Sequence, residues 1–169
     1  MSNDPIAGLD RDNLEKLARS LLWQYRVVDA FWFINVENRF DLATAEDLNA
    51  AVWAKVGKLA ARDIKERFGI AATGLRGVVR AMHYYPWYLM DAFRIEDRGS
   101  ELIVTSDNCP AQLGRFKHGL GEYACKEMHA QEFIHFCEVI DPQIKVECEF
   151  APPDPHPEGQ FCKWRISCG

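Results

Sequence analysis

The sequence predicts a single α+β domain in which N-terminal helices and a C-terminal helix pack on an antiparallel β-sheet. Two observations predict this class. Apolar residues recur at three- and four-residue steps in the first half of the chain, and short runs in the second half alternate between apolar and polar residues. The helical part is expected at about residues 10–83, and a hairpin, helix, hairpin part at about 86–168. The length of 169 residues fits one domain, 1–169.

Two long helices are expected first. Asp10 is a suitable N-cap for a helix whose apolar positions continue to Val36. Thr44 with Asp47 resembles a capping box, and the apolar positions that follow predict a second helix running toward Phe68.

The middle of the chain changes its period. A shorter third helix is expected at about 75–83. Apolar and polar residues then alternate over 87–96, a turn-forming stretch occupies 97–100, and a β-rich run follows at 102–105. These features predict a β-hairpin.

The C-terminal part begins with a strong helical pattern over 122–140, which ends before Pro142. Two alternating runs, 144–150 and 162–168, predict a second pair of strands. The loop 152–159 between them holds four prolines, which exclude regular secondary structure there.

Composition excludes several classes of protein. A hydrophobic fraction of 48% and a charged fraction of 27% are those of a folded domain rather than a disordered chain. The net charge of −5, without a block of Lys or Arg, argues against binding to nucleic acid or to an anionic membrane. Without a long apolar run or a secretory signal, the chain is expected in the cytoplasm, with a small molecule as its partner.

Cysteines are the first candidates for chemistry, because all six lie between positions 109 and 168. If the loop 152–159 closes a symmetric hairpin, Cys148 and Cys162 face each other with inward thiols. Adding Cys109 and Cys125 would complete a four-thiolate metal site, suited to zinc and less to an iron–sulfur cluster. The alternative is that these thiols are ordinary core residues.

The last helix places polar groups on its apolar face. On a helical wheel Glu122, Cys125, His129 and Glu132 interrupt that face, so they are expected to pair, to bind a ligand, or to lie at the edge of the core. Glu122, Cys125 and His129 are the catalytic candidates. For Glu122 there is a structural alternative, since an acid in the first turn complements the helix dipole.

Four further residues are candidates for ligand binding. Asp154 and His156 lie between prolines in a stiff loop that could present a base or a ligand, or could be only a tight turn. Asp29 and Trp32 could line a pocket where the first helix meets the sheet, although an aromatic stripe at helical spacing is more often part of a core.

Several segments of the C-terminal half carry a family resemblance: Cys109-Pro110-Ala111-Gln112, Gly119-Leu120-Gly121-Glu122, Cys125-Lys126, Ile140-Asp141-Pro142, Cys148, residues 152–157 and Cys162-Lys163-Trp164-Arg165. With these segments the chain resembles an uncharacterised family of small prokaryotic cytosolic proteins. That family is similar to aminothiazoline-carboxylate hydrolase-like proteins and, more remotely, to vinyl-reductase-type ligand-binding domains.

The resemblance implies helices packed on an antiparallel sheet, a small-molecule pocket between them, and a homodimer. In the hydrolase-like branch, water adds to an amidine-type carbon and opens a thiazoline ring. Glu122 would then act as a base beside a zinc-bound water, or Cys125 as a nucleophile near His129. Two functions follow: binding of a small molecule or metal, which is favoured, and alternatively hydrolysis of a small cyclic amidine.

Overall fold

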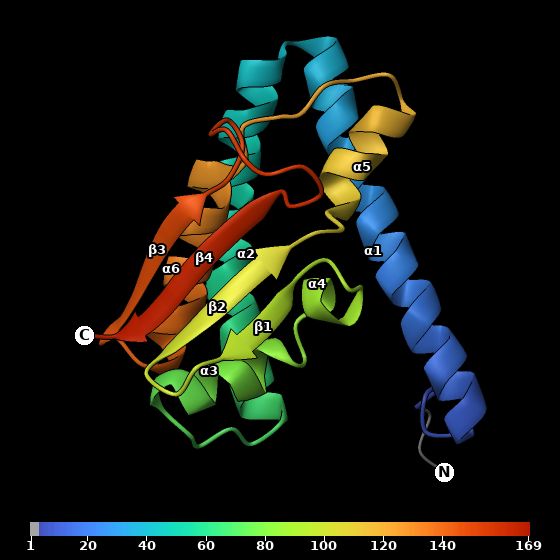
Figure 1. Cartoon of the computed structure of the whole chain (residues 1–169). Helices are drawn as coiled ribbons and strands as arrows, with labels where there is room; N and C mark the ends of the chain where they lie inside the picture. Colours follow the sequence, from blue (N-terminus) through green and yellow to red (C-terminus); the bar gives the residue numbers. More distant parts are fainter. Residues whose placement is uncertain (1–3) are drawn as a thin grey trace.

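Helices pack against an antiparallel sheet in the computed structural model, which describes residues 4–169 (Figure 1). The α+β class predicted from the sequence is therefore confirmed, and the first three residues of the predicted domain lie outside the described part. In chain order the elements are α1 (Arg11–Arg39), α2 (Leu42–Arg67), α3 (Gly74–Met82), α4 (Pro86–Leu89), β1 (Arg94–Asp97), β2 (Glu101–Ser106), α5 (Pro110–Lys117), α6 (Lys126–Ile140), β3 (Ile144–Phe150) and β4 (Cys162–Cys168).

The sheet has the strand order β1-β2-β4-β3, so β2 and β4 join two hairpins at its centre. Each neighbouring pair is antiparallel. The first hairpin is shorter than predicted, because residues 86–89 form α4 and β1 begins only at Arg94. Pro86 lies in the first turn of α4, where its fixed φ favours a helix and its missing N–H costs nothing. The predicted strand over 87–96 is therefore wrong in its first half.

Capping explains the starts of the two long helices. Asp10 caps α1 as predicted, and its side chain accepts a hydrogen bond from the backbone N–H of Asn13. The cap of α2 is Asp41, whose side chain accepts from the backbone N–H of Thr44. The predicted capping box at Thr44 is therefore wrong, because Asp41 already satisfies one of the free N–H groups of the first turn.

Two boundaries in the C-terminal half also differ from the prediction. Residues 110–117 form α5, which the sequence pattern did not indicate and which again begins with a proline in its first turn. Helix α6 begins at Lys126 rather than at Glu122, and the Lys126 N–H bonds to the carbonyl of Pro152. The acid at 122 therefore lies outside the first turn, so the helix-dipole explanation for Glu122 is wrong.

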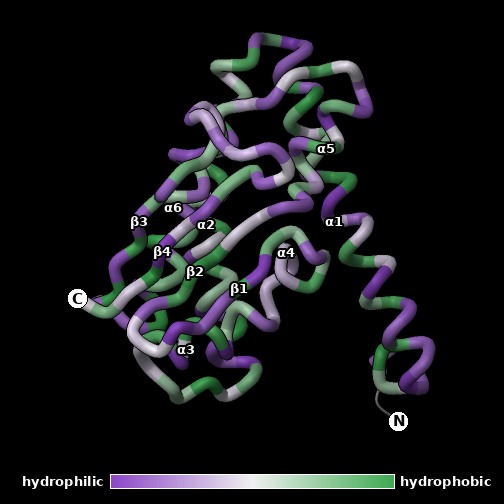
Figure 2. Tube along the Cα trace, viewed as in Figure 1, coloured by the Kyte–Doolittle hydropathy of each residue, from purple (hydrophilic) through white to green (hydrophobic). Residues whose placement is uncertain are grey.

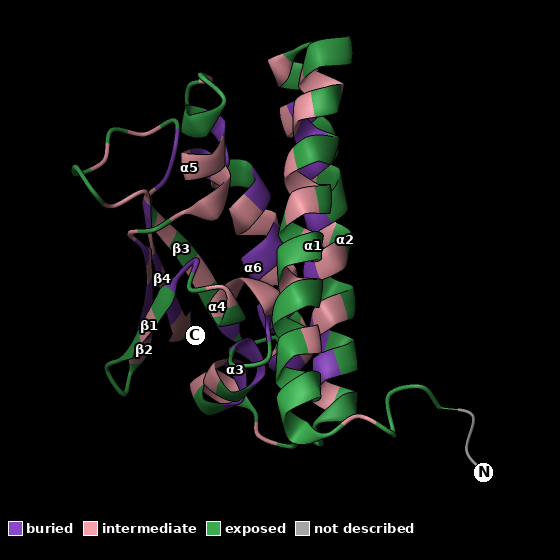
Figure 3. Ribbon diagram, turned by 90° about the vertical axis from the view of Figure 1, so that its right-hand side faces the viewer, coloured by how far each residue is buried: buried purple, intermediate pink, exposed green. Residues whose placement is uncertain are grey.

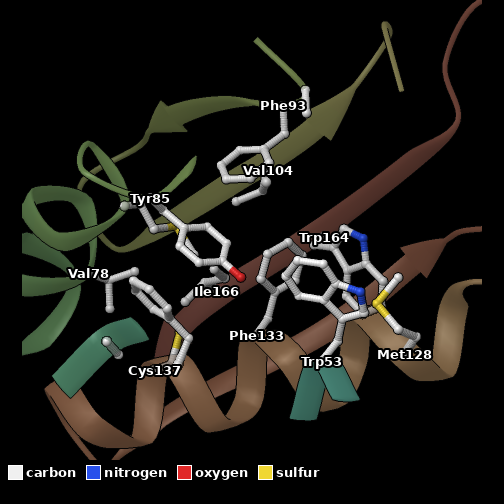
Figure 4. Packing of buried hydrophobic residues seen from close by; sticks show 14 of the residues in the cluster. Trp53, Val78, Tyr85, Phe93, Val104, Met128, Phe133, Cys137, Trp164 and Ile166 are labelled. Carbon is white, nitrogen blue, oxygen red and sulfur yellow. The ribbon is translucent and has the colours of Figure 1, made fainter. Parts of the chain in front are cut away.

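The core lies between α6, α2 and the inner face of the sheet, where the buried residues concentrate (Figure 3). Phe133, Phe136 and Ile140 of α6 are buried, as the wheel predicts. Figure 4 shows Phe133 among side chains from several elements, with the hydroxyl of Tyr85 pointing into the interior. This packing fixes which face of α6 is turned inward, and with it the positions of Cys125, His129 and Glu132.

Helix α1 is packed far less than its neighbours. Among its 29 residues Phe33 is the buried one, while Leu14, Leu21 and Val28 are 39%, 53% and 68% exposed. Its first half leads away from the rest of the fold (Figure 1), and hydrophobic residues recur along this half as well (Figure 2). Within residues 4–169, no helix combines the length and the apolar character needed to span a bilayer.

Candidate functional site

A cavity lies where α1, α2 and α4 meet α6 and the inner face of β2 and β4. It encloses about 660 Å³ of space between protein atoms, including the solvent at its mouth. Most of its wall is apolar. The aromatic part of the wall consists of Trp53, Trp87, Phe93, Tyr123, Phe133 and Phe161.

Glu132 is the centre of the polar side of this cavity. It is only 1% exposed, and its two carboxylate oxygens have different partners. Oε1 accepts a hydrogen bond from the hydroxyl of Tyr85, and Oε2 lies 2.7 Å from Nδ1 of His129. The spacing of three residues on α6 places His129 and Glu132 on one face of the helix, which is why this pair can form. His129 is thereby oriented by a buried carboxylate.

A second carboxylate, Asp29 of α1, lines the same cavity. Burial raises the pKa of Asp29 to about 6, and the negative charge of Glu132 adds to the increase. A hydrogen bond with the side chain of Trp53 acts in the opposite direction. Burial also raises the pKa of Tyr25 and of Tyr85, with a further contribution from Glu132, so both phenols keep their protons at neutral pH. The acids and phenols therefore form one electrostatically coupled group.

Three thiols, those of Cys109, Cys125 and Cys162, also line the cavity. Burial raises the pKa of all three, that of Cys162 to about 12. The amide of Gln112 lies 3.6 Å from Sγ of Cys125. Because the thiolate is the nucleophile and the metal ligand, protonated thiols at neutral pH are poor in both roles.

Cys148 does not face Cys162, so the predicted opposition of the two is wrong. The register pairs Cys148 with Trp164 and shifts between Cys148 and Phe150, because the proline-rich loop closes asymmetrically. Cys148 and Cys162 lie diagonally on the same face of the sheet instead. Across residues 4–169, no group of three or more His, Cys, Asp or Glu side chains is arranged to hold a metal ion. The described residues therefore do not gather the thiols around one point, as a zinc or iron–sulfur site requires.

The remaining candidates lie outside the cavity wall. Glu122 Oε2 lies 3.2 Å from Nε2 of His156, and Nζ of Lys126 donates to Oδ2 of Asp154 at 2.8 Å. These contacts hold the proline-rich loop against the start of α6. The hydrogen bond to Glu122 raises the pKa of His156. Trp32 is 39% exposed on α1. The structure thus brings Asp29, Cys125 and His129 together but separates Glu122, Asp154, His156 and Trp32 from them.

Sequence reasoning noted Glu132 on the apolar face but assigned it no role, although the spacing of His129 and Glu132 on one helix was a usable signal. Tyr85 and Trp53 were missed altogether. Both look like ordinary core aromatics in the sequence, and only the fold brings them to the carboxylates.

The fold and the cavity define an α+β protein with an apolar pocket between its helices and its sheet. The chain belongs to DUF6125, a family of unknown function, whose sequence profile matches residues 8–168. No curated protein matches the chain. One similar solved structure is described as trafficking protein particle complex subunit 3 from Naegleria fowleri covalently bound to palmitic acid. The likeness covers 95% of this chain and 97% of that one, with 14% identity and a TM-score of 0.46. At that level it carries no information about the ligand of this chain.

Proposed function

We propose that the protein binds a small, largely apolar molecule in the cavity between its helices and its sheet. The observation that carries this proposal is the cavity itself, whose aromatic walls surround a few polar groups. Ligand pockets of folded proteins typically combine apolar walls with a few placed polar groups. Protein interiors are otherwise close-packed, and unfilled space next to a core lowers stability.

The polar side of the cavity supports the same proposal. Glu132 is buried with two partners, Tyr85 and His129, rather than exposed to water. A buried carboxylate raises the free energy of the folded state unless its partners compensate. A preformed polar group against an apolar wall is the arrangement that orients a bound molecule.

Binding of a neutral apolar dye tests this function. Trp53 and Trp87 line the cavity, so quenching of tryptophan fluorescence reports on its occupancy when Nile red is added. Ala111 also lines the cavity, and Ala111→Phe should fill it and weaken dye binding by about tenfold or more. Ala51→Phe is the matched control, because Ala51 is exposed on α2. Equal dye binding by the two variants would overturn the proposal.

Hydrolysis of a small cyclic amidine is a second candidate, and one observation favours it. With Nδ1 of His129 held by Glu132, Nε2 is the ring nitrogen left to exchange a proton inside the cavity. In this hydrolase hypothesis, His129 is the general base. Glu122 is engaged with His156 away from the cavity wall, and the thiol of Cys125 keeps its proton.

We also propose that α1 pairs with a second copy of the chain. The protein exposes 10154 Å², against about 8,500 Å² for a compact monomer of this mass. The excess of about 1,650 Å² is about twice the roughly 800 Å² per partner that a standard interface covers. Leu14, Leu21 and Val28 recur at seven-residue intervals on the exposed side of α1, the spacing of a helix-pairing seam. An antiparallel pair would place the protruding half of each α1 along the other copy.

A further inference from the structure

The ionisable groups on the cavity wall are one-sided in charge. Asp29 and Glu132 supply two carboxylates, and among the described residues the imidazole of His129 is the one basic side chain on the wall. Among residues 4–169, neither Lys nor Arg lines the cavity. A buried negative charge is costly unless a positive group balances it, so the wall of this cavity favours a cation over an anion.

The hydrogen bonds at these carboxylates leave the charge in place. Glu132 accepts from the neutral hydroxyl of Tyr85 and contacts the imidazole of His129, and Asp29 is bonded to the neutral indole of Trp53. Neutral donors stabilise an anion by hydrogen bonding, but they do not cancel its charge. Even a positively charged imidazole would balance only one of the two carboxylates, so a cation entering the cavity would meet a net negative wall.

The aromatic groups beside Asp29 favour the same kind of ligand. Tyr25, Trp53 and Trp87 converge from α1, α2 and α4, with ring centroids 5.4 Å apart for the two tryptophans. The Tyr25 ring lies 6.1 Å from Trp53 and 5.9 Å from Trp87. Aromatic faces attract cations, and tryptophan does so most strongly. Carboxylates beside an aromatic cluster suit a positive nitrogen attached to an apolar body.

We infer that the ligand is an organic amine, whose protonated nitrogen binds at Asp29 and Glu132 and whose apolar part lies between the aromatic walls. This inference rests on the proposed binding function and adds the chemical class of the ligand. An anionic ligand would face two like charges in the same place. A neutral ligand would leave the carboxylates unbalanced. The two alternatives give different results in a single set of titrations.

Three probes of similar size separate the classes: 2-phenylethylamine, 2-phenylethanol and 3-phenylpropanoate, each titrated calorimetrically at pH 7.5. We expect the amine to bind at least about tenfold more tightly than the alcohol, and the carboxylate to bind most weakly. If the alcohol and Nile red bind but the amine has no advantage, the ligand class is wrong and the binding function stands. If neither the probes nor Nile red binds, the binding function itself fails.

A variant of Asp29 tests where the protonated nitrogen of the ligand binds. Asp29→Asn keeps the shape of the side chain and an oxygen for the bond to Trp53, but removes the charge; we expect it to lose most of the preference for the amine. Asp12→Asn is the matched control, because Asp12 is exposed on the same helix outside the cavity. Undiminished preference in a folded Asp29→Asn protein would overturn the inference.

Lowering the pH of the wild-type protein gives a second readout that needs no substitution. Burial raises the pKa of Asp29 to about 6, and the ionisable groups that interact with its charge are Tyr25, Tyr85, Cys109, Tyr123, His129 and Glu132. Protonation of Asp29 removes a negative charge and with it attraction for a cation. Amine affinity should fall between pH 7.5 and 5 while alcohol affinity stays constant. The inference would be contradicted if the affinities for the amine and for the alcohol changed in parallel with pH.

Discussion

A Cβ atom built on Gly57 of α2 would lie 2.5 Å from the carbonyl oxygen of Glu132 on α6. The two helices approach each other at the residue that organises the polar side of the cavity, since Glu132 also contacts Tyr85 and His129. Only a residue without a side chain permits this approach. The position of the carboxylate thus depends on a glycine of the neighbouring helix.

Gly57→Ala should therefore destabilise the protein by about 1–3 kcal/mol, because backbone must move to make room for the methyl group. Urea unfolding measures the change. Gly114→Ala in α5 is the matched control, since a Cβ there meets no atom within 4 Å and alanine is the better helix former. A Gly57→Ala protein as stable as the wild type would show that α2 and α6 are not so close.

Replacing Asp29 should change the pH dependence of stability. The pKa of Asp29 is about 6 in the folded protein, against 3.8 for an ordinary aspartate. Between pH 3.8 and 6 the folded state therefore keeps a proton on Asp29 that the unfolded state has lost. Stability therefore falls as the pH rises from about 4 to 6. Asp29→Asn should be more stable than the wild type at pH 7.5, by roughly 3 kcal/mol, and nearly equal at pH 4.

The comparison is made by urea unfolding of both proteins at the two pH values. Carboxyls with a lowered pKa, such as Asp154 beside Lys126, act in the opposite direction but are common to both proteins. They cancel in the difference. A stability difference that does not depend on pH would show that Asp29 has an ordinary pKa.

Two substitutions separate binding from hydrolysis. If the protein opens a cyclic amidine, His129→Asn should reduce turnover by about 100-fold or more, as expected for loss of a positioned base. Glu122→Gln should leave turnover unchanged, because Glu122 contacts His156 away from the cavity. Turnover is followed by release of the ring-opened product from a thiazoline. Loss of turnover in Glu122→Gln but not in His129→Asn would instead assign the role of general base to Glu122.

Self-association through α1 makes a hydrodynamic prediction. Leu21→Glu should convert a dimer to a monomer in sedimentation velocity, because a charge would enter the centre of the apolar seam. Leu89→Glu in α4 is the matched control, since both leucines are 53% exposed. A wild-type chain that sediments as a monomer at high concentration would exclude this pairing.

The cysteines allow a test by metal removal. Since the described residues do not place three donors around one point, the unfolding midpoint should be insensitive to a chelator. Cys125→Ala and Cys148→Ala should each lower the free energy of unfolding only by the lost packing of a small side chain. The two losses should add. Stoichiometric zinc in purified protein, with a midpoint lowered by chelation, would restore the predicted four-cysteine site.

The helices and strands were largely predictable because they depend on local periodicity. The long apolar repeats that became α1 and α2, and the alternation that became β3 and β4, are properties of neighbouring residues. Short elements were not predictable in the same way. Both α4 and α5 are single short helices started by a proline, and a few residues offer too little periodicity to recognise.

The candidate site was predictable only where its members share one element. His129 and Cys125 belong to the inward face of α6, and the wheel places them there. The partners of that face come from elsewhere in the chain. Asp29 was expected in a pocket, but its association with Glu132 could not be read from a separation of about a hundred residues.

The sequence by itself determined the α+β class, the long helices, the inward face of α6 and an acidic chain with cysteines gathered at one end. Tertiary structure alone decided which polar groups meet. A bulge between Cys148 and Phe150 placed Trp164 opposite Cys148, and the close approach at Gly57 positioned Glu132 beside the cavity. The reason is physical: periodicity specifies which side of an element is buried, whereas register and helix approach depend on atoms distant in the chain.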